Sequence, residues 1–125
     1  MSLSNIELGK LGEELAVDFL RKKRCKIIKQ NYSCLFGEID IIAKFKRSLF
    51  FIEVKTRHSS KFGFPQEAVD KKKQRQISKV ALHYLTSHQL TKIPARFDVI
   101  SILLDTEKQI KWIQNAFPLT ERYSY

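Results

Sequence analysis

The stretch Gly37-Glu-Ile-Asp-Ile-Ile-Ala43, followed closely by Phe51-Ile-Glu-Val-Lys-Thr-Arg57, decides the fold prediction. Both segments have the apolar composition of strands, yet each carries charge where a buried strand should be apolar. Asp40 stands among isoleucines, and Glu53 and Lys55 flank Val54. A buried charge costs free energy unless it is paired or bound to a metal ion. An Asp followed on the next strand by Glu-x-Lys is the minimal residue set of a metal-dependent phosphodiesterase.

The turn between these two strands determines how the carboxylates face each other. If residues 46–47 form a two-residue turn, Phe45 pairs with Ser48 and Asp40 lies directly opposite Glu53. A turn centred one residue earlier leaves the two carboxylates diagonal on the same face, whereas an odd loop puts them on opposite faces. With an even turn they would stand roughly 5 to 8 Å apart, close enough to share a divalent ion.

The residue types suit a magnesium or manganese ion. Mg²⁺ prefers hard oxygen ligands and keeps several waters, so we expect Asp40, Glu53 and the Val54 carbonyl as its ligands. Side chains alternate along a strand, which places Lys55 on the face of Glu53, where it could orient water or stabilise developing charge. The alternative is a salt bridge between Asp40 and Lys55 across the strand pair, because Glu-x-Lys alone is a common pattern.

The first helix offers a further carboxylate. At ~100° per residue, Glu13 lies at the border of the apolar stripe, whereas Glu14 lies farther into the polar face. Glu13 can therefore reach over the sheet more easily. On helix geometry alone, however, an ordinary solvated helix residue is favoured for either position, and a place for Glu13 near the metal and the catalytic residues needs further support.

The hydrophobic periodicity along the chain predicts an α/β fold of order α-β-β-β-α-β-β, a mixed central sheet flanked by helices. The length of 125 residues predicts one domain, 1–125, in which 114–125 form a tail. The expected helices are 5–23 and 71–87, the latter capped by Asp70; the expected strands are 26–32, 38–45, 49–56, 97–104 and 109–113, with loops at 31–37 and 58–65.

The charge predicts a polyanionic partner. The formal net charge is +10 and the isoelectric point about 9.8, which favours nucleic acid before membrane; a merely soluble basic protein is the alternative. Lysines at a helix N-terminus oppose the helix dipole, and a bound anion would relieve this, although a solvated first turn is equally compatible. The expected nucleic-acid contacts are Arg21, Lys22, Lys23, Arg24, Arg57, Lys71, Lys72, Lys73 and Gln74.

Cysteine usage and the N-terminus bear on the compartment. The two cysteines lack metal-ligand spacing, no signal peptide is visible, and no apolar run approaches the length of a membrane span. We therefore expect a cytoplasmic protein with free thiols and no membrane partner; a homodimer is compatible with the sequence.

An ordered set of motifs resembles the YraN-like family of small bacterial proteins over about residues 9–104. That family resembles the PD-(D/E)XK nuclease superfamily, which includes archaeal Holliday-junction resolvases and the tRNA-endonuclease-like fold. The resemblance implies a restriction-endonuclease-like core. The motifs are Gly9-x-x-Gly12-Glu13, Asn31-Tyr32, Gly37–Ala43, Phe51–Arg57, Phe62-Gly63, Glu67-Ala-Val69 and Arg96-Phe-Asp-Val99.

The resemblance also implies residue roles and a function. Asp40, Glu53 and Lys55 match the metal and catalytic triad, and Glu13 matches the helix glutamate of the resolvases, while Ile39 replaces the proline before the Asp. The implied activity is endonucleolytic cleavage of DNA, rather than RNA, on branched or repair substrates with Mg²⁺ or Mn²⁺. The alternative is an inactive nucleic-acid-binding or accessory module of a repair or recombination complex. Retention of all three triad residues favours the nuclease.

Overall fold

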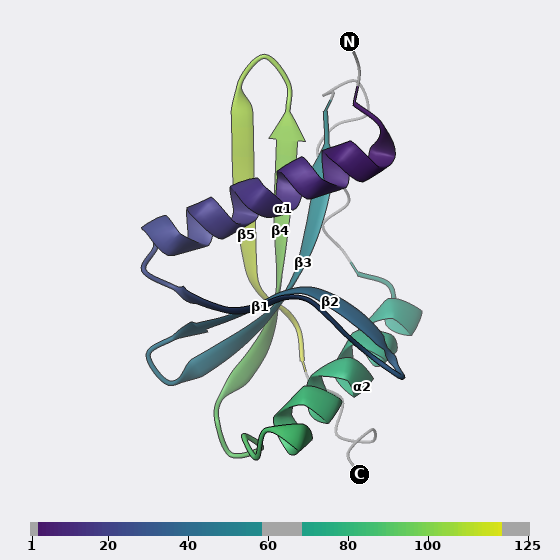
Figure 1. Cartoon of the computed structure of the whole chain (residues 1–125), viewed down its shortest axis with the longest axis vertical. Coiled ribbons are helices and arrows are strands. Elements are labelled where there is room, and N and C mark those ends of the chain that lie inside the picture. Colours follow the sequence, from purple (N-terminus) through teal and green to yellow (C-terminus); the bar gives the residue numbers. More distant parts are fainter. Residues whose placement is uncertain (1–2, 59–68, 119–125) are drawn as a thin grey trace.

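Five strands form one mixed sheet, and a helix lies against each of its faces (Figure 1). The computed structural model describes residues 3–58 and 69–118. This architecture confirms the α/β class, the order α-β-β-β-α-β-β and a restriction-endonuclease-like core. The elements are α1 (Asn5–Lys22), β1 (Lys26–Cys34), β2 (Gly37–Phe45), β3 (Ser48–Arg57), α2 (Lys71–Ser87), β4 (Ala95–Leu104) and β5 (Lys108–Phe117).

Two predicted boundaries are wrong. β1 continues to Cys34, so most of the predicted loop 31–37 is strand, and residues 35–36 form the turn to β2. β5 continues to Phe117, so the first residues of the predicted tail belong to the sheet. Residues 119–125 of that tail and nearly all of the predicted loop 58–65 lie outside the described residues.

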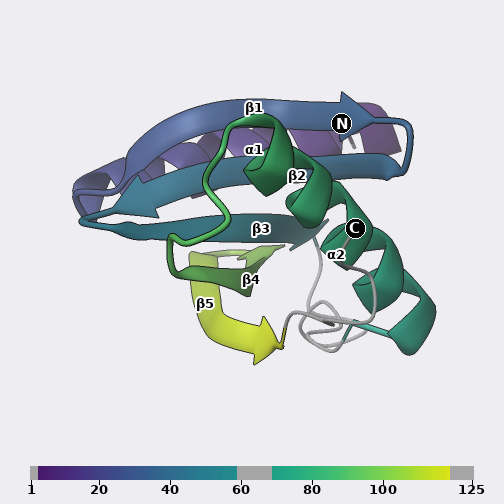
Figure 2. The ribbon, with the colours of Figure 1, turned by 90° about the horizontal axis from the view of Figure 1, so that it is seen from below.

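The sheet has the strand order β1-β2-β3-β4-β5, and only β3 and β4 pair in parallel among the described strands. A parallel pair needs a long crossover connection, and α2 lies within it. Figure 2 shows α1 and α2 on opposite sides of the sheet. Within residues 3–58 and 69–118, two helices thus cover the two faces of the central strands.

Helix α1 begins with a capping box between Ser4 and Glu7 and buries Ala16, Val17 and Leu20 against one face of the sheet. A methyl group added at Gly12 would collide with the Thr56 side chain. The glycine therefore permits α1 to approach β3 closely. This close approach brings the next residue of the helix, Glu13, over the sheet.

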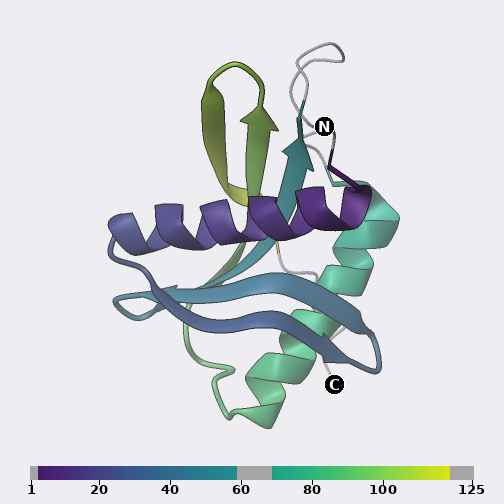
Figure 3. The same ribbon diagram turned by 45° about the horizontal axis from the view of Figure 1, so that its top comes forward.

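The β2–β3 hairpin has the predicted two-residue turn, because Phe45 pairs with Ser48. The ladder runs from that pair to Ile41 and Ile52. In Figure 3 the β1–β2 hairpin then passes beneath α1, whereas β3 continues in another direction. The next residues along the two strands are Asp40 and Glu53. We call the point at which β2 and β3 part, at these two residues, the fork.

Candidate active site

Asp40 is half-buried at the fork, and its side chain is held by the backbone of β3. The amide of Val54 donates a 2.8 Å hydrogen bond to Asp40 Oδ2. Burial raises the pKa of Asp40, while the Val54 hydrogen bond and the charge of Lys73 lower it. In a strand the N–H and C=O of one residue point to the same side. The Val54 carbonyl therefore also faces β2, which places a backbone oxygen beside the Asp40 carboxylate.

Glu53 is the most strongly perturbed group at the fork. Burial, followed by repulsion from Asp40, raises the pKa of Glu53 to about 7, although Lys73 and Lys55 oppose the shift. The Lys73 ammonium lies 3.8 Å from Glu53 Oε1. Lys55 is half-buried two residues farther along β3. Two cationic side chains thus partly offset the crowding of two carboxylates in a low-dielectric setting.

Glu13 reaches the same region from α1, whereas Glu14 is exposed. Burial raises the pKa of Glu13, and repulsion from Asp40 and Glu38 adds to the shift. Its Oε1 atom is buried and has no hydrogen-bond partner among the described residues. A buried carboxylate oxygen without a donor is costly. The structure therefore places Asp40 near both of the other predicted carboxylates, and repulsion from Asp40 contributes to the raised pKa of Glu13 and of Glu53.

The oxygen donors at the fork fit a divalent ion of the magnesium type. Mg²⁺ is commonly held by one or two carboxylates and keeps several waters. Asp40, Glu53 and the Val54 carbonyl supply such a set, and the partnerless oxygen of Glu13 stands beside it. In the described part of the chain, no group of three or more His, Cys, Asp or Glu side chains is arranged so that it could hold a metal ion. The donors available at the fork are therefore two carboxylates and a backbone carbonyl.

The N-terminus of α2 supplies a cation to the carboxylates. Lys73 is directed at Glu53, as its ion pair shows. The neighbouring Gln74 donates its side-chain amide to the Val69 carbonyl at 2.7 Å, so that part of its hydrogen-bonding capacity is used within the protein. Asp70 caps the helix by accepting a hydrogen bond from the Lys73 amide at 2.8 Å. A carboxylate of the chain therefore already provides negative charge at this terminus.

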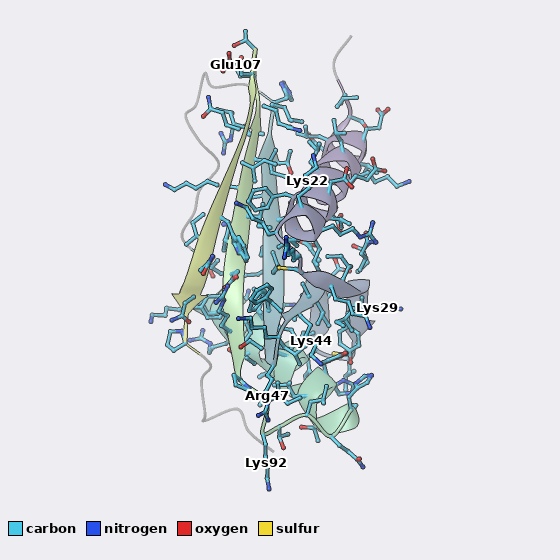
Figure 4. The ribbon with its side chains drawn as sticks, turned by 90° about the vertical axis from the view of Figure 1, so that its left-hand side faces the viewer. Lys22, Lys29, Lys44, Arg47, Lys92 and Glu107 are labelled. Carbon is cyan, nitrogen blue, oxygen red and sulfur yellow. The ribbon has the colours of Figure 1, made fainter. Side chains whose placement is uncertain are left out.

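The remaining basic residues lie at two separate places. Lys71 and Lys72 are exposed on the first turn of α2, and Arg57 is half-buried at the end of β3. Residues 21–24 are exposed at the C-terminal end of α1, about 15 Å along the helix from Glu13. Figure 4 shows Lys22, Lys29, Lys44 and Arg47 spread along one side of the molecule. The basic residues 21–24 therefore lie apart from the carboxylates.

Sequence reasoning missed a buried carboxylate on β4. Asp98 is 1% exposed and accepts hydrogen bonds from Arg96 Nε at 3.0 and 3.2 Å, from Trp112 Nε1 at 2.8 Å and from the Asn115 amide at 2.8 Å. The signal was present, because Asp98 stands between apolar strand residues as Asp40 does. Its carboxylate is paired within the protein, so the same pattern here marks a structural ion pair.

Glu38 was also missed as a contributor to the site. It is exposed, two residues before Asp40 on β2, and its charge raises the pKa values of Glu13, Asp40 and Glu53. It therefore adds to the negative potential at the fork.

None of the described helices is both long and apolar enough to cross a membrane.

Comparison with known proteins places the fork within a shared sequence region. The model of a family described as Uncharacterised protein family UPF0102 matches residues 12–102. A UPF0102 protein of Geobacter metallireducens is 50% identical over 120 residues, covering 95% of this chain and 98% of that protein. One of Syntrophus aciditrophicus is 47% identical over 116 residues, 92% of this chain and 91% of that protein. One of Clostridioides difficile is 46% identical over 115 residues, 92% of this chain and 100% of that protein.

Proposed function

This chain belongs to the UPF0102 family, the YraN-like proteins that its motifs resemble, and from its own residues we propose that it is a divalent-metal-dependent endonuclease acting on DNA. One observation carries the proposal. Asp40 and Glu53 occupy the two positions that follow the last β2–β3 pair, with Asp40 fixed by the Val54 amide and Lys73 beside Glu53. Two carboxylates held in this way at the fork could bind a metal ion that promotes hydrolysis of a phosphodiester.

The metal is Mg²⁺ or Mn²⁺ in this proposal. When bound, it would lower the pKa of a water molecule and neutralise charge on the phosphate. Asp40, Glu53 and the Val54 carbonyl would hold it, and Glu13 would act nearby, directly or through water. The pKa values of these three carboxylates are raised. This supports the assignment, because a bound cation would stabilise their charged forms.

The chain's own cations have distinct roles in the proposal. Lys55 projects from the strand of Glu53 and would orient the attacking water or stabilise charge that develops on the phosphate. Lys73 pairs with Glu53 in the free protein and would turn to a phosphate oxygen when the metal neutralises that carboxylate. Both roles place positive charge around an anionic reaction centre.

The two basic clusters would supply most of the affinity for nucleic acid, because phosphate contacts position the substrate without reading its sequence. Lys71 and Lys72 lie beside the fork, and residues 21–24 lie at the far end of α1. The resemblance to junction resolvases favours DNA over RNA and branched or repair structures as substrates. The net charge of +10 favours nucleic acid over a membrane surface.

A second function has one observation in its favour. The Lys73–Glu53 ion pair gives the carboxylate a countercharge from the chain itself, without a metal ion. In this alternative the protein binds nucleic acid without cutting it, as an accessory to a repair or recombination complex. The two proposals differ in whether the purified protein cleaves.

A cleavage assay on labelled single-stranded, duplex, flap and four-way DNA, with Mg²⁺ or Mn²⁺, tests the nuclease proposal. We expect metal-dependent cleavage of at least one substrate, abolished by Asp40→Asn, Glu53→Gln or Lys55→Ala while DNA binding persists. Glu14→Gln, an exposed carboxylate change on α1, is the matched control and should cleave normally. Binding of DNA without cleavage of any substrate would favour the accessory module.

A further inference from the structure

A cavity of about 300 Å³ opens on the α1 side of the sheet, away from the fork. Its walls combine aromatic rings with positive charge and an amide. Phe50 and Trp112 meet edge to face at 6.0 Å between ring centroids. The cavity is lined by Lys23, Cys25, Phe45, Phe50, Arg96, Trp112 and Gln114.

The Arg96 side chain is fixed in this cavity from two directions. Its guanidinium carbon lies 3.9 Å from the centroid of the Phe50 ring, in a cation–π contact. Its Nε atom donates to both oxygens of Asp98, which is 1% exposed. Trp112 Nε1 donates to the same carboxylate at 2.8 Å. A buried carboxylate therefore holds a cation and an indole ring in set orientations, so the cavity is a built feature of the fold.

Two of the wall residues contribute open surface at the rim. Phe45 is 36% exposed, and Lys23 is exposed at the end of α1. Lys46 Nζ lies 5.5 Å from the centroid of the Phe45 ring, so positive charge borders the aromatic face. An aromatic face with adjacent cations is the combination that holds unstacked bases and their phosphates.

We propose that this cavity binds one unstacked nucleobase of a single-stranded segment, with the flanking phosphate on Lys23 and the adjoining basic residues 21–24. The guanidinium of Arg96 and the rings of Phe45 and Trp112 provide stacking surfaces, and the Gln114 amide can hydrogen-bond to a base edge. The cavity volume of about 300 Å³ accommodates one base. A base can enter such a pocket only when it is unstacked, so the pocket would select nucleic acid that has single-stranded character.

The cavity and the fork lie at different places on the same two elements. Helix α1 carries Glu13 near the fork and Lys23 at the cavity, about 15 Å apart. Phe50 and Glu53 are three residues apart on β3, so their side chains leave opposite faces of the strand: Phe50 lies on the face that α1 covers, and Glu53 lies on the face of Lys73 and α2. The base pocket is therefore separate from the Glu53 carboxylate and would add its own contact with the nucleic acid. The inference rests on the proposed nucleic-acid function, and it adds a substrate class that the fork alone does not define.

The chain contains its own reporter for this site, because Trp112 is its only tryptophan. Tryptophan fluorescence, excited selectively, is titrated with oligothymidylate of twelve nucleotides in EDTA, and in parallel with an abasic oligomer of the same length. Anisotropy of labelled versions of both measures total binding. We expect oligothymidylate to quench Trp112 and to bind at least about fivefold more tightly than the abasic oligomer, which should bind without quenching.

Rim variants locate the effect without disturbing the buried ion pair. Phe45→Ala should lower the affinity for oligothymidylate about fivefold or more and leave that for the abasic oligomer unchanged. Leu35→Ala is the matched control, because Leu35 is 91% exposed at the β1–β2 turn and lies outside the cavity wall. It should behave as wild type, and thermal unfolding should show that both variants fold.

The outcomes separate this inference from the proposed function. Tight oligothymidylate binding without quenching, equal quenching by the abasic oligomer, or equal affinities for Phe45→Ala and wild type would overturn the base pocket and leave the nuclease proposal standing. Absence of any binding by anisotropy at low salt would overturn both.

Discussion

The Val54 amide donates to Asp40 Oδ2 at 2.8 Å, where the β2–β3 ladder gives way to the fork. A side-chain oxygen here takes the place that a strand carbonyl would occupy in a continuing ladder. The contact orients the carboxylate and turns the Val54 carbonyl toward the same side. The end of strand pairing and the placement of metal-binding oxygens are therefore one structural event.

The pH dependence of stability should report the burial of Glu53. Its pKa is about 7 in the folded protein, against an ordinary value of 4.5. Between pH 4.5 and about pH 7, the native state therefore retains a proton that the unfolded chain has lost. Stability contributed by this group is present at low pH and is lost as pH rises through about 7. The free energy of unfolding of Glu53→Gln, taken relative to that of wild type, should therefore rise by on the order of 2 kcal/mol between pH 5 and pH 8.

Urea unfolding in EDTA at both pH values measures this difference. The pKa of about 7 already includes the opposing charge of Lys73, so the change of the stability gap with pH is the informative quantity. A gap that stays constant from pH 5 to pH 8 would show that Glu53 titrates normally.

The two adjacent glutamates of α1 should differ in importance for cleavage. Glu13 is partly buried against the fork and its pKa is raised by burial and by Asp40, whereas Glu14 is exposed. Glu13→Gln should lower the cleavage rate roughly 10- to 100-fold, as expected for a group that supports metal ligands. Glu14→Gln should have no effect. Single-turnover assays decide this, and equal rates for the two variants would remove Glu13 from the site.

The two glycines of α1 should respond oppositely to alanine. Gly12→Ala pushes a methyl group into Thr56 and should destabilise the fold by about 1 to 3 kcal/mol. Gly9→Ala meets nothing within 4 Å and should stabilise the helix by about 0.5 to 1 kcal/mol. Denaturant unfolding checks both. A neutral Gly12→Ala would mean that α1 does not need its close approach to β3.

Salt dependence should identify the phosphate contacts. Replacing Lys71, Lys72 and Lys73 by alanine should weaken DNA binding and reduce the magnitude of the slope of log affinity against log salt by about 2 to 3, because fewer counterions are released. Replacing Lys108 and Lys111 on β5 by alanine serves as the comparison, because it removes two positive charges at another place on the protein. An unchanged slope for the α2 variant would exclude that helix terminus from the interface.

Much of the fold follows from local sequence signals, and the fork is the clearest example. Strand alternation limited the turn between these strands to three geometries, and the structure has the one with two loop residues, in which Phe45 pairs with Ser48 and Asp40 and Glu53 follow the last pair. The helical angle of Glu13 allowed an approach to the sheet but did not favour it over a solvated position. These features depend on residues close in sequence, where periodicity is informative.

The two wrong boundaries depend on partners distant in sequence. Ser33 and Cys34 belong to β1 because they pair with Glu38 and Gly37, although the local residues resemble a loop. In β5, Asn115 has a positive φ of 55°, which suggests a turn, but its amide donates to the buried Asp98. Strand propensity reflects such context more than the residue itself.

Calorimetric titration of Mn²⁺ into the purified protein, compared with Asp40→Asn and Glu53→Gln, tests the central claim that these two carboxylates share a divalent ion. Glu14→Gln serves as the control for loss of a surface carboxylate. The account predicts saturable binding to wild type and Glu14→Gln, at least tenfold weaker in each fork variant because a ligand is lost. Absence of saturable binding to wild type, or equal affinities in all four proteins, would contradict it.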